Sequence, residues 1–194
     1  MFALDANHLV QDSGARVALV ARRAPEIEVW CRAQGWAEHE FAVYGADVRD
    51  IVITHLHNDH AGTFDEYPNA RFHLQDKEMA YATGRYMCCD RFSRPYEPDH
   101  VTGFVRLVFK DRVSFHDGDA ELAPGISVHL IGGHTAGLQC VRVHTARGWV
   151  VLASDASHYY EHFEQRRCFP LVHHVGDMVA GFDRLRELAD SPAH

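Results

Sequence analysis

The sequence lacks the features of several specialised protein classes, and cysteine is the first of them. Its 194 residues contain only 5 cysteines, an odd number that cannot pair completely within one chain. Cys88 and Cys89 are adjacent, a spacing that fits no paired-cysteine zinc template. We therefore predict reduced thiols, as in a cytoplasmic protein, rather than a secreted disulfide scaffold.

Long apolar runs and an excess of basic residues are also missing. No hydrophobic run approaches the ~20 residues of a membrane span, and residues 1–20 carry no basic segment followed by an apolar core. We therefore expect neither a membrane anchor nor a signal peptide. Lysine and arginine number 19 against 27 acidic residues, which gives a formal net charge of −8. This charge argues against nucleic acid or an anionic membrane as the main partner.

The hydrophobic pattern predicts a single domain over residues 1–194, without repeats or flexible linkers. Strands mixed with flanking helices, without strict alternation, point to a layered α/β or α+β fold. Residues 85–99 are polar, aromatic and proline-bearing, which predicts a long loop or a cap segment. The predicted strands are 17–21, 51–54, 72–74, 105–109, 113–115, 120–122, 127–131, 140–144 and 149–153, and the predicted helices are 27–34, 76–83 and 178–189.

A cluster of histidines, HLHNDH, directly follows a β-branched strand. His55 and His57 are two residues apart, so an extended backbone points both imidazoles in the same direction. Asp59 and His60 follow where the chain must turn, and can face a neighbouring point. Imidazole and carboxylate suit zinc or iron, and a chain of this composition produces the pattern by chance roughly 0.009 times. A polar turn that happens to carry histidines is the alternative.

Two further segments place a histidine or an aspartate at the end of an apolar strand. His134 lies within GGHTAG (132–137), where glycines allow the backbone to approach a shared centre. Asp155 follows the apolar run VVLA. Taken alone, His134 is also compatible with a turn, and Asp155 with a helix cap. One metal site is the simplest explanation for three strand ends that deliver histidine and aspartate.

These motifs resemble those of a known family. THLHNDHAG, GGHTAG and SDA, in this order, resemble the metallo-β-lactamase superfamily, and within it the N-acyl-homoserine lactonases, which are quorum-quenching hydrolases. GISVHLIGGHTAGLQCVRV, GWVVLASDASHYYEHF and FHLQDKEMAYATG extend the resemblance over roughly residues 45–194. It implies an αββα sandwich with a two-metal site at one edge of the sheets.

The resemblance also implies a ligand set and a reaction. Two divalent ions, zinc or iron or a mixed pair, would share a hydroxide that attacks the carbonyl of a small lactone, most simply an N-acyl-homoserine lactone. Asp59 or a metal-bound water would protonate the departing alkoxide. The implied ligands are His55, His57 and His134 for the first ion, and Asp59, His60 and the bridging Asp155 for the second.

One substrate-binding position departs from the family pattern. Some members bind the substrate carbonyl through a tyrosine three residues after the bridging aspartate, and this position is His158 here. Tyr159 follows directly and can take the role after a small shift, or else simply pack with its hydroxyl exposed. A similar choice, between lining an acyl-chain pocket and packing in a core or subunit interface, applies to Met79, Tyr81, Tyr86, Met87 and Phe92.

Two terminal segments of the family pattern are not evident. A further histidine, commonly in Gly-His-Asp after the last helix, completes the second metal site, but this sequence ends at SPAH. At the other end, Asp12-Ser13-Gly14 is the only counterpart of an Asp-Thr-Gly turn. We therefore expect a chain truncated at both ends, whose exposed sheet edges favour a homodimer.

The resulting prediction is a metal-dependent hydrolase that opens a small lactone. Hydrolysis of another cyclic ester or thioester is the alternative within enzymes, because the metal motif serves many substrates. A metal-binding but catalytically silent chain is the alternative outside them, because the last ligand is missing. The net charge disfavours the nuclease branch, and His57 stands where the flavin-linked di-iron branch usually has a carboxylate.

Overall fold

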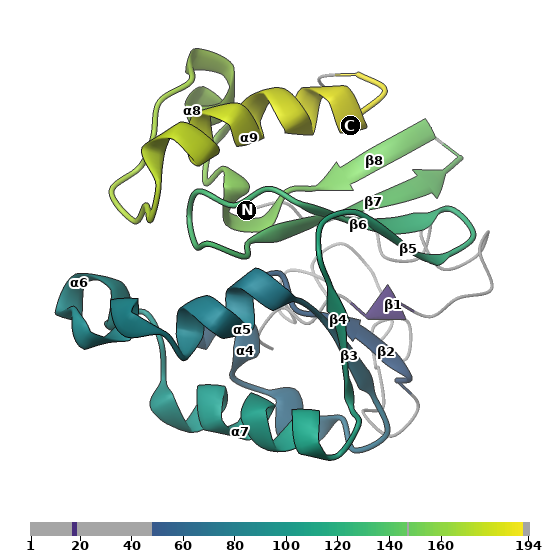
Figure 1. The fold of residues 1–194 in the computed structure, drawn as a ribbon. Helices are drawn as coiled ribbons and strands as arrows, with labels where there is room; N and C mark the ends of the chain where they lie inside the picture. The colour runs from purple at the N-terminus through teal and green to yellow at the C-terminus, as the bar shows by residue number, and fades with distance from the viewer. Residues whose placement is uncertain (1–16, 19–47, 147, 192–194) are drawn as a thin grey trace, which may run out of the picture.

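The computed structural model describes residues 17–18, 48–146 and 148–191 of the chain. Two four-stranded sheets lie against each other, and helices cover the outer face of each (Figure 1). The layer order is helix, sheet, sheet, helix, which confirms the predicted αββα sandwich. The predicted helix 27–34 lies outside the described residues.

The first sheet is parallel, with strand order β1-β2-β3-β4. Its central residues Ile51 and Phe72 are fully buried, as expected for strands covered on both faces. Its strands are β1 (Val17–Ala18), β2 (Asp50–Val52), β3 (Arg71–Gln75) and β4 (Val113–His116). The outer layer over this sheet contains η2 (Phe64–Glu66), η3 (Arg85–Cys88), α4 (Asn58–Ala61), α5 (Asp76–Ala82), α6 (Asp90–Ser93) and α7 (Pro98–Phe109).

The second sheet is an antiparallel meander, β5-β6-β7-β8. Its valines, including Val128 and Val141, pack against Val52 of the first sheet and form the core between the two sheets. Its strands are β5 (Ala120–Ala123), β6 (Ile126–Leu130), β7 (Gln139–Thr145) and β8 (Gly148–Leu152). Over its outer face lie α8 (Tyr160–Gln165) and α9 (Val175–Leu188), and α9 buries the predicted stripe Met178, Phe182, Leu185 and Leu188.

The prediction of a strand over 105–109 is wrong, because these residues form the second half of α7. Val101, Phe104 and Leu107 are buried at a spacing of three residues, which is a helical rather than an alternating pattern. Pro98 stands at the start of this helix, where its missing N–H costs nothing. The predicted loop 85–99 likewise contains η3, α6 and the first residues of α7.

A glutamine pair joins the two sheets, between the carboxyl end of β3 and the first residue of β7. Gln75 Nε2 donates to Gln139 Oε1 at 2.9 Å, and Gln139 Nε2 donates to the carbonyls of Ile53 and His73 at 2.8 and 3.0 Å. Both amides are fully buried, so these hydrogen bonds fix how the ends of β2, β3 and β7 meet. The described helices include none with the length and apolar composition of a membrane span.

Candidate metal centre

The histidine motif follows the end of β2 and lies between the two sheets. The Ile53 N–H donates to the His73 carbonyl at 3.0 Å, and the Gln139 N–H donates to the Thr54 carbonyl at 3.0 Å. These two hydrogen bonds therefore fix the backbone up to Thr54, the residue before His55. Both His55 and His57 are buried, as their position after a buried strand requires.

The other two arms of the site leave β6 and β8. His134 follows Gly133, whose φ is +84° and whose added Cβ would lie 2.5 Å from the Met178 nitrogen. Glycine is therefore required at 133 for the loop to lie directly on α9. Asp155 lies in the short turn η4 (Ser154–Ala156) directly after β8.

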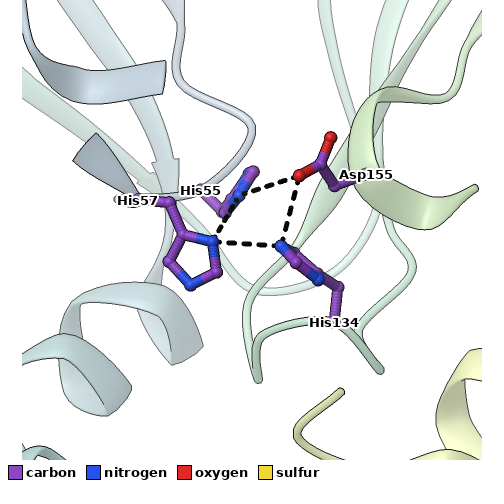
Figure 2. A group of neighbouring side chains, drawn as sticks. All are labelled: His55, His57, His134 and Asp155. Atoms are coloured by element: carbon purple, nitrogen blue, oxygen red, sulfur yellow. Dashed lines mark hydrogen bonds and ion pairs between the residues drawn. The ribbon is translucent and has the colours of Figure 1, made fainter. Parts of the chain in front are cut away.

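Four side chains from these three arms meet at one point (Figure 2). The Nε2 of His55 and the Nε2 of His134 lie 3.1 and 3.0 Å from Nδ1 of His57. Asp155 Oδ2 closes the ring, 3.3 Å from His134 Nε2 and 3.7 Å from His55 Nε2. All four ligand atoms lie within 4.8 Å of one another. We call this group the metal quartet.

The donor set and its spacing fit a zinc-sized ion. Four tetrahedral ligands at 2.0–2.1 Å from zinc lie about 3.3 Å from one another, close to the four separations of 3.0–3.7 Å around the ring of the quartet. The outer nitrogen of His134, Nδ1, donates to the Leu171 carbonyl at 2.7 Å, which leaves Nε2 with a free lone pair toward the quartet. Nδ1 of His55 lies 3.2 Å from Thr54 Oγ1, a second contact of this kind.

The protonation states also fit a metal site. Burial, reinforced by the neighbouring imidazoles, lowers the pKa of His55 well below its ordinary value. Burial and the charge of His134 lower the pKa of His57 to about 3. Both rings are therefore neutral at physiological pH, and a neutral imidazole is the form that binds a metal ion.

Asp155 is the anionic member of the quartet. Burial alone would raise the pKa of its carboxyl group, but the surrounding imidazoles, first that of His134, lower it below the ordinary value. The carboxylate therefore stays ionised, as a metal ligand must.

Asp59 and His60 lie beside the quartet but outside it. His60 Nε2 is 3.6 Å from Asp155 Oδ2 and 3.6 Å from Asp59 Oδ2, and the His60 ring centroid is 4.2 Å from that of His55. Burial favours a lower pKa for His60, but the hydrogen bond and charge of Asp155 raise it above its ordinary value. The Asp59 side chain is 63% exposed. These two residues thus form a more open group next to Asp155.

The structure treats the two predicted substrate-binding residues differently. His158 Nε2 lies 3.4 Å from Asp155 Oδ2, and its ring stacks on Phe169 with centroids 3.7 Å apart. Tyr159 is 69% exposed, and its ring packs edge-on against His162 at 5.3 Å. His158 therefore reaches the quartet, while Tyr159 lies on the surface next to it.

A small cleft, partly open to solvent, lies beside the quartet and is lined by both His57 and His134. Of the five residues predicted to line a pocket, Tyr81 and Phe92 line this cleft. Tyr86 contacts both of their rings, and Met79 and Met87 pack against the core under the first sheet. The remaining walls of the cleft come from Arg91, Pro95, Pro170, Leu171 and Val172.

Sequence reasoning missed Glu78, which is fully buried behind the site. A signal was available, because Glu78 shares one face of α5 with the buried Tyr81 and Ala82. A charged residue on the apolar face of a helix indicates a specific partner. Sequence reasoning also missed the segment 169–172, because this segment carries no recognisable motif.

Comparisons with known proteins give the relatives of this chain. The family model of the metallo-beta-lactamase superfamily matches residues 29–193. The chain is 32% identical over 114 residues to the N-acyl homoserine lactonase AiiB of Agrobacterium fabrum, covering 57% of this chain and 41% of that protein. It is 30% identical over 138 residues to the N-acyl homoserine lactonase AiiA of Bacillus thuringiensis subsp. kurstaki, covering 71% and 46%. The chain thus spans less than half the length of these two relatives.

Solved structures give the same relationship. A quorum-quenching N-acyl homoserine lactone hydrolase superposes with a TM-score of 0.63 at 25% identity, covering 77% of this chain and 56% of that one. An AiiA variant from B. thuringiensis, with N-decanoyl-L-homoserine bound at its active site, gives a TM-score of 0.61 at 25% identity, covering 80% and 54%.

Proposed function

The chain belongs to the metallo-β-lactamase superfamily, and from this premise we propose that it is a metal-dependent hydrolase that opens the ring of an N-acyl-homoserine lactone. The metal quartet is the observation that carries the proposal, because three imidazoles and one carboxylate converge there. The lactonase relatives and structures support the substrate class.

We propose that two divalent ions, zinc in the first place, are the cofactors. His55, His57, His134 and Asp155 would hold the first, and Asp155 would share the second with Asp59 and His60. A divalent ion held there supplies Lewis acidity and lowers the pKa of water toward neutrality. The described separations, 3.0–3.7 Å within the quartet and 3.6 Å around His60, support both groups.

The side chains around the quartet would perform the proton transfer and bind the substrate. Hydrolysis adds a water across the ester bond, so that its hydroxyl joins the acyl carbon and its proton reaches the ring oxygen. Asp59 is exposed at the site entrance and can pass this proton to the departing alkoxide. His158, which is exposed and lies 3.4 Å from Asp155, would donate a hydrogen bond to the lactone carbonyl, with Tyr159 as the neighbouring alternative. The cleft lined by Tyr81, Phe92 and Leu171 would accept the acyl chain.

A second candidate is a chain that binds one metal ion and does not catalyse. One observation favours it: among the described residues, the quartet is the single group of three or more donors whose ligand atoms all lie within 4.8 Å. Asp59 and His60 are more loosely placed. Another cyclic ester or a thioester as substrate is the alternative within the hydrolase proposal.

Metal content and lactone turnover, measured on the same preparation, separate these candidates. The lactonase proposal expects close to two metal ions per chain and acid release from an N-acyl-homoserine lactone panel. The silent candidate expects one ion and no acid release. Substitution His57→Ala is expected to abolish both metal binding and turnover, whereas the matched control His144→Ala, at an exposed position of β7, leaves both unchanged. Full metal retention by His57→Ala contradicts the ligand assignment.

We also propose that the protein works in the cytoplasm, on the basis of the free thiols of Cys88, Cys89, Cys140 and Cys168. Cys31 lies outside the described residues. The single domain over 1–194 and the homodimer stay predictions, and analytical ultracentrifugation tests the latter.

A further inference from the structure

Glu78 is a fully buried carboxylate on α5 that touches both histidine loops of the metal centre. No lysine or arginine accounts for its charge in the contacts described. Instead, four hydrogen-bond donors converge on its two oxygens, and they come from three separate segments of the chain.

Each oxygen of Glu78 serves a different part of the site. Oε1 accepts the backbone N–H of Leu56, the residue between His55 and His57, at 2.9 Å. Oε2 accepts the hydroxyl of Thr135, the residue after His134, at 2.6 Å. It also accepts the N–H of Gly137 at 3.1 Å. One carboxylate thus joins the loop after β2 to the loop after β6.

The fourth donor extends the connection to an imidazole. Tyr96 donates its hydroxyl to Glu78 Oε1 at 2.9 Å, and its ring packs edge-on against His57 with centroids 4.6 Å apart. The orientation of the His57 ring therefore also depends on Glu78, through Tyr96.

Gly137 shows how closely the second loop is seated on this carboxylate. A Cβ added at Gly137 would lie 2.1 Å from the Glu78 nitrogen and 2.4 Å from its Cα. A side chain at 137 would push the loop away from α5. The hydrogen bonds of Glu78 to Thr135 and Gly137 would then be lost. The close approach and the hydrogen bonds indicate independently that this loop lies at a fixed distance from α5.

We propose that Glu78 is a positioning residue of the metal centre, which holds the loops of His57 and His134 at the separation that a metal ion requires. The inference rests on the metal centre proposed above. Four donors and no acceptor face the carboxylate, which matches its ionised, acceptor-only form. Burial opposes this and raises the pKa of Glu78, while the hydrogen bonds from Leu56, Thr135 and Tyr96 act against the increase.

The test compares metal binding by the full chain and by Glu78→Gln. The amide keeps the shape of the carboxylate but turns one acceptor oxygen into an NH₂ group, which faces a donor. Zinc affinity, measured by chelator competition, is expected to fall about tenfold, as for other residues that support ligands. The visible absorption spectrum of the Co²⁺-loaded protein is expected to change, because the imidazoles no longer meet at the same angles.

Asp76→Asn is the matched control. Asp76 lies in the first turn of the same helix, is exposed, and loses the same charge without touching either loop. Thr135→Val and Tyr96→Phe each remove one donor and keep the charge, so they remain informative if Glu78→Gln does not fold. Each is expected to weaken zinc binding by less than Glu78→Gln and to shift the Co²⁺ spectrum in the same direction.

A merely structural role predicts a different result. In that case, Glu78→Gln lowers the unfolding temperature but keeps the wild-type zinc affinity and Co²⁺ spectrum, which overturns the proposal. A wild-type chain that binds no metal overturns both the metal centre and the role of Glu78. Metal binding without lactone turnover contradicts only the proposed reaction, because the readouts for Glu78 do not involve the substrate.

Discussion

His134 and Leu171 are joined by a hydrogen bond of 2.7 Å, from the imidazole Nδ1 to the backbone carbonyl. The two residues are 37 positions apart, and the bond links the loop after β6 to the segment before α9. It fixes the tautomer of His134, so that Nε2 presents its lone pair to the metal quartet. Because Leu171 also lines the neighbouring cleft, this hydrogen bond links the position of the His134 imidazole to the position of the cleft wall.

This connection predicts that metal binding protects residues 169–174 from hydrogen exchange. The N–H groups of His173 and His174 donate to the carbonyl of Gly133, one residue before His134, at 2.8 and 2.9 Å. Fixing His134 on a metal ion therefore also stabilises these bonds. Hydrogen-exchange mass spectrometry with and without zinc measures the effect, with β5 as the internal reference. Equal protection of 169–174 in both states contradicts the prediction.

The metal-free protein is expected to lose stability as the pH falls from about 6 to 4.5. The folded-state pKa of His57 is about 3, below its unfolded value near 6.5, and that of His55 is also lowered. Between these values the unfolded chain binds more protons than the folded one, so acidification favours unfolding. Each such histidine contributes a slope of up to about 1.4 kcal/mol per pH unit. His60 has a raised pKa and acts above this window, and Asp155 acts below it.

Urea unfolding of the metal-free protein over this pH range measures the slope, and His57→Gln provides the comparison. The variant lacks one of the imidazoles whose pKa is lowered by folding, and it is expected to show a shallower pH dependence. Parallel pH profiles for wild type and variant are inconsistent with a neutral His57 in the folded state.

Substitution Asp59→Asn is expected to lower lactone turnover by about 10²-fold or more, in keeping with the loss of a proton-transfer group. Its amide cannot relay a proton and is a poorer metal ligand than a carboxylate. Asp65→Asn, an exposed position in η2, removes the same charge and is expected to change little. Initial rates at saturating lactone and metal measure the difference. Wild-type turnover by Asp59→Asn eliminates the proton-transfer role.

The metal quartet could be predicted from the sequence because its members directly follow apolar strands. His55, His134 and Asp155 each occupy the first positions after a buried run, and strand ends are fixed points of a sheet. The helix over 105–109 was missed because its valines and phenylalanine have high strand propensity, and only packing onto the first sheet decides its conformation. Glu78 could not be assigned to the site either, since its partners Leu56 and Thr135 are 22 and 57 positions away.

Gly133→Ala is expected to destabilise the fold by about 3 kcal/mol, which combines backbone strain at φ +84° with a clash against Met178 on α9. Gly118→Ala is the matched control, with φ +101° and nothing within 4 Å of the added carbon, and is expected to cost only about 1 kcal/mol of strain. Chemical denaturation of the two variants measures the difference. Equal losses at both positions show that α9 yields to the loop without cost.

Phe92→Ala is expected to impair long-chain lactones more than short-chain ones. The Phe92 ring lines the cleft beside His57 and contacts the rings of Tyr81 and Tyr86, so an acyl tail in the cleft loses apolar contact when the ring is removed. Apolar contact of this size is worth about 1.5 kcal/mol, which is about tenfold in KM for a decanoyl lactone. A butanoyl lactone, whose tail is too short to fill the cleft, is expected to keep its KM. Phe109→Ala, at an exposed phenylalanine that ends α7, is the control. The same change in KM for both chain lengths indicates that the acyl tail lies elsewhere.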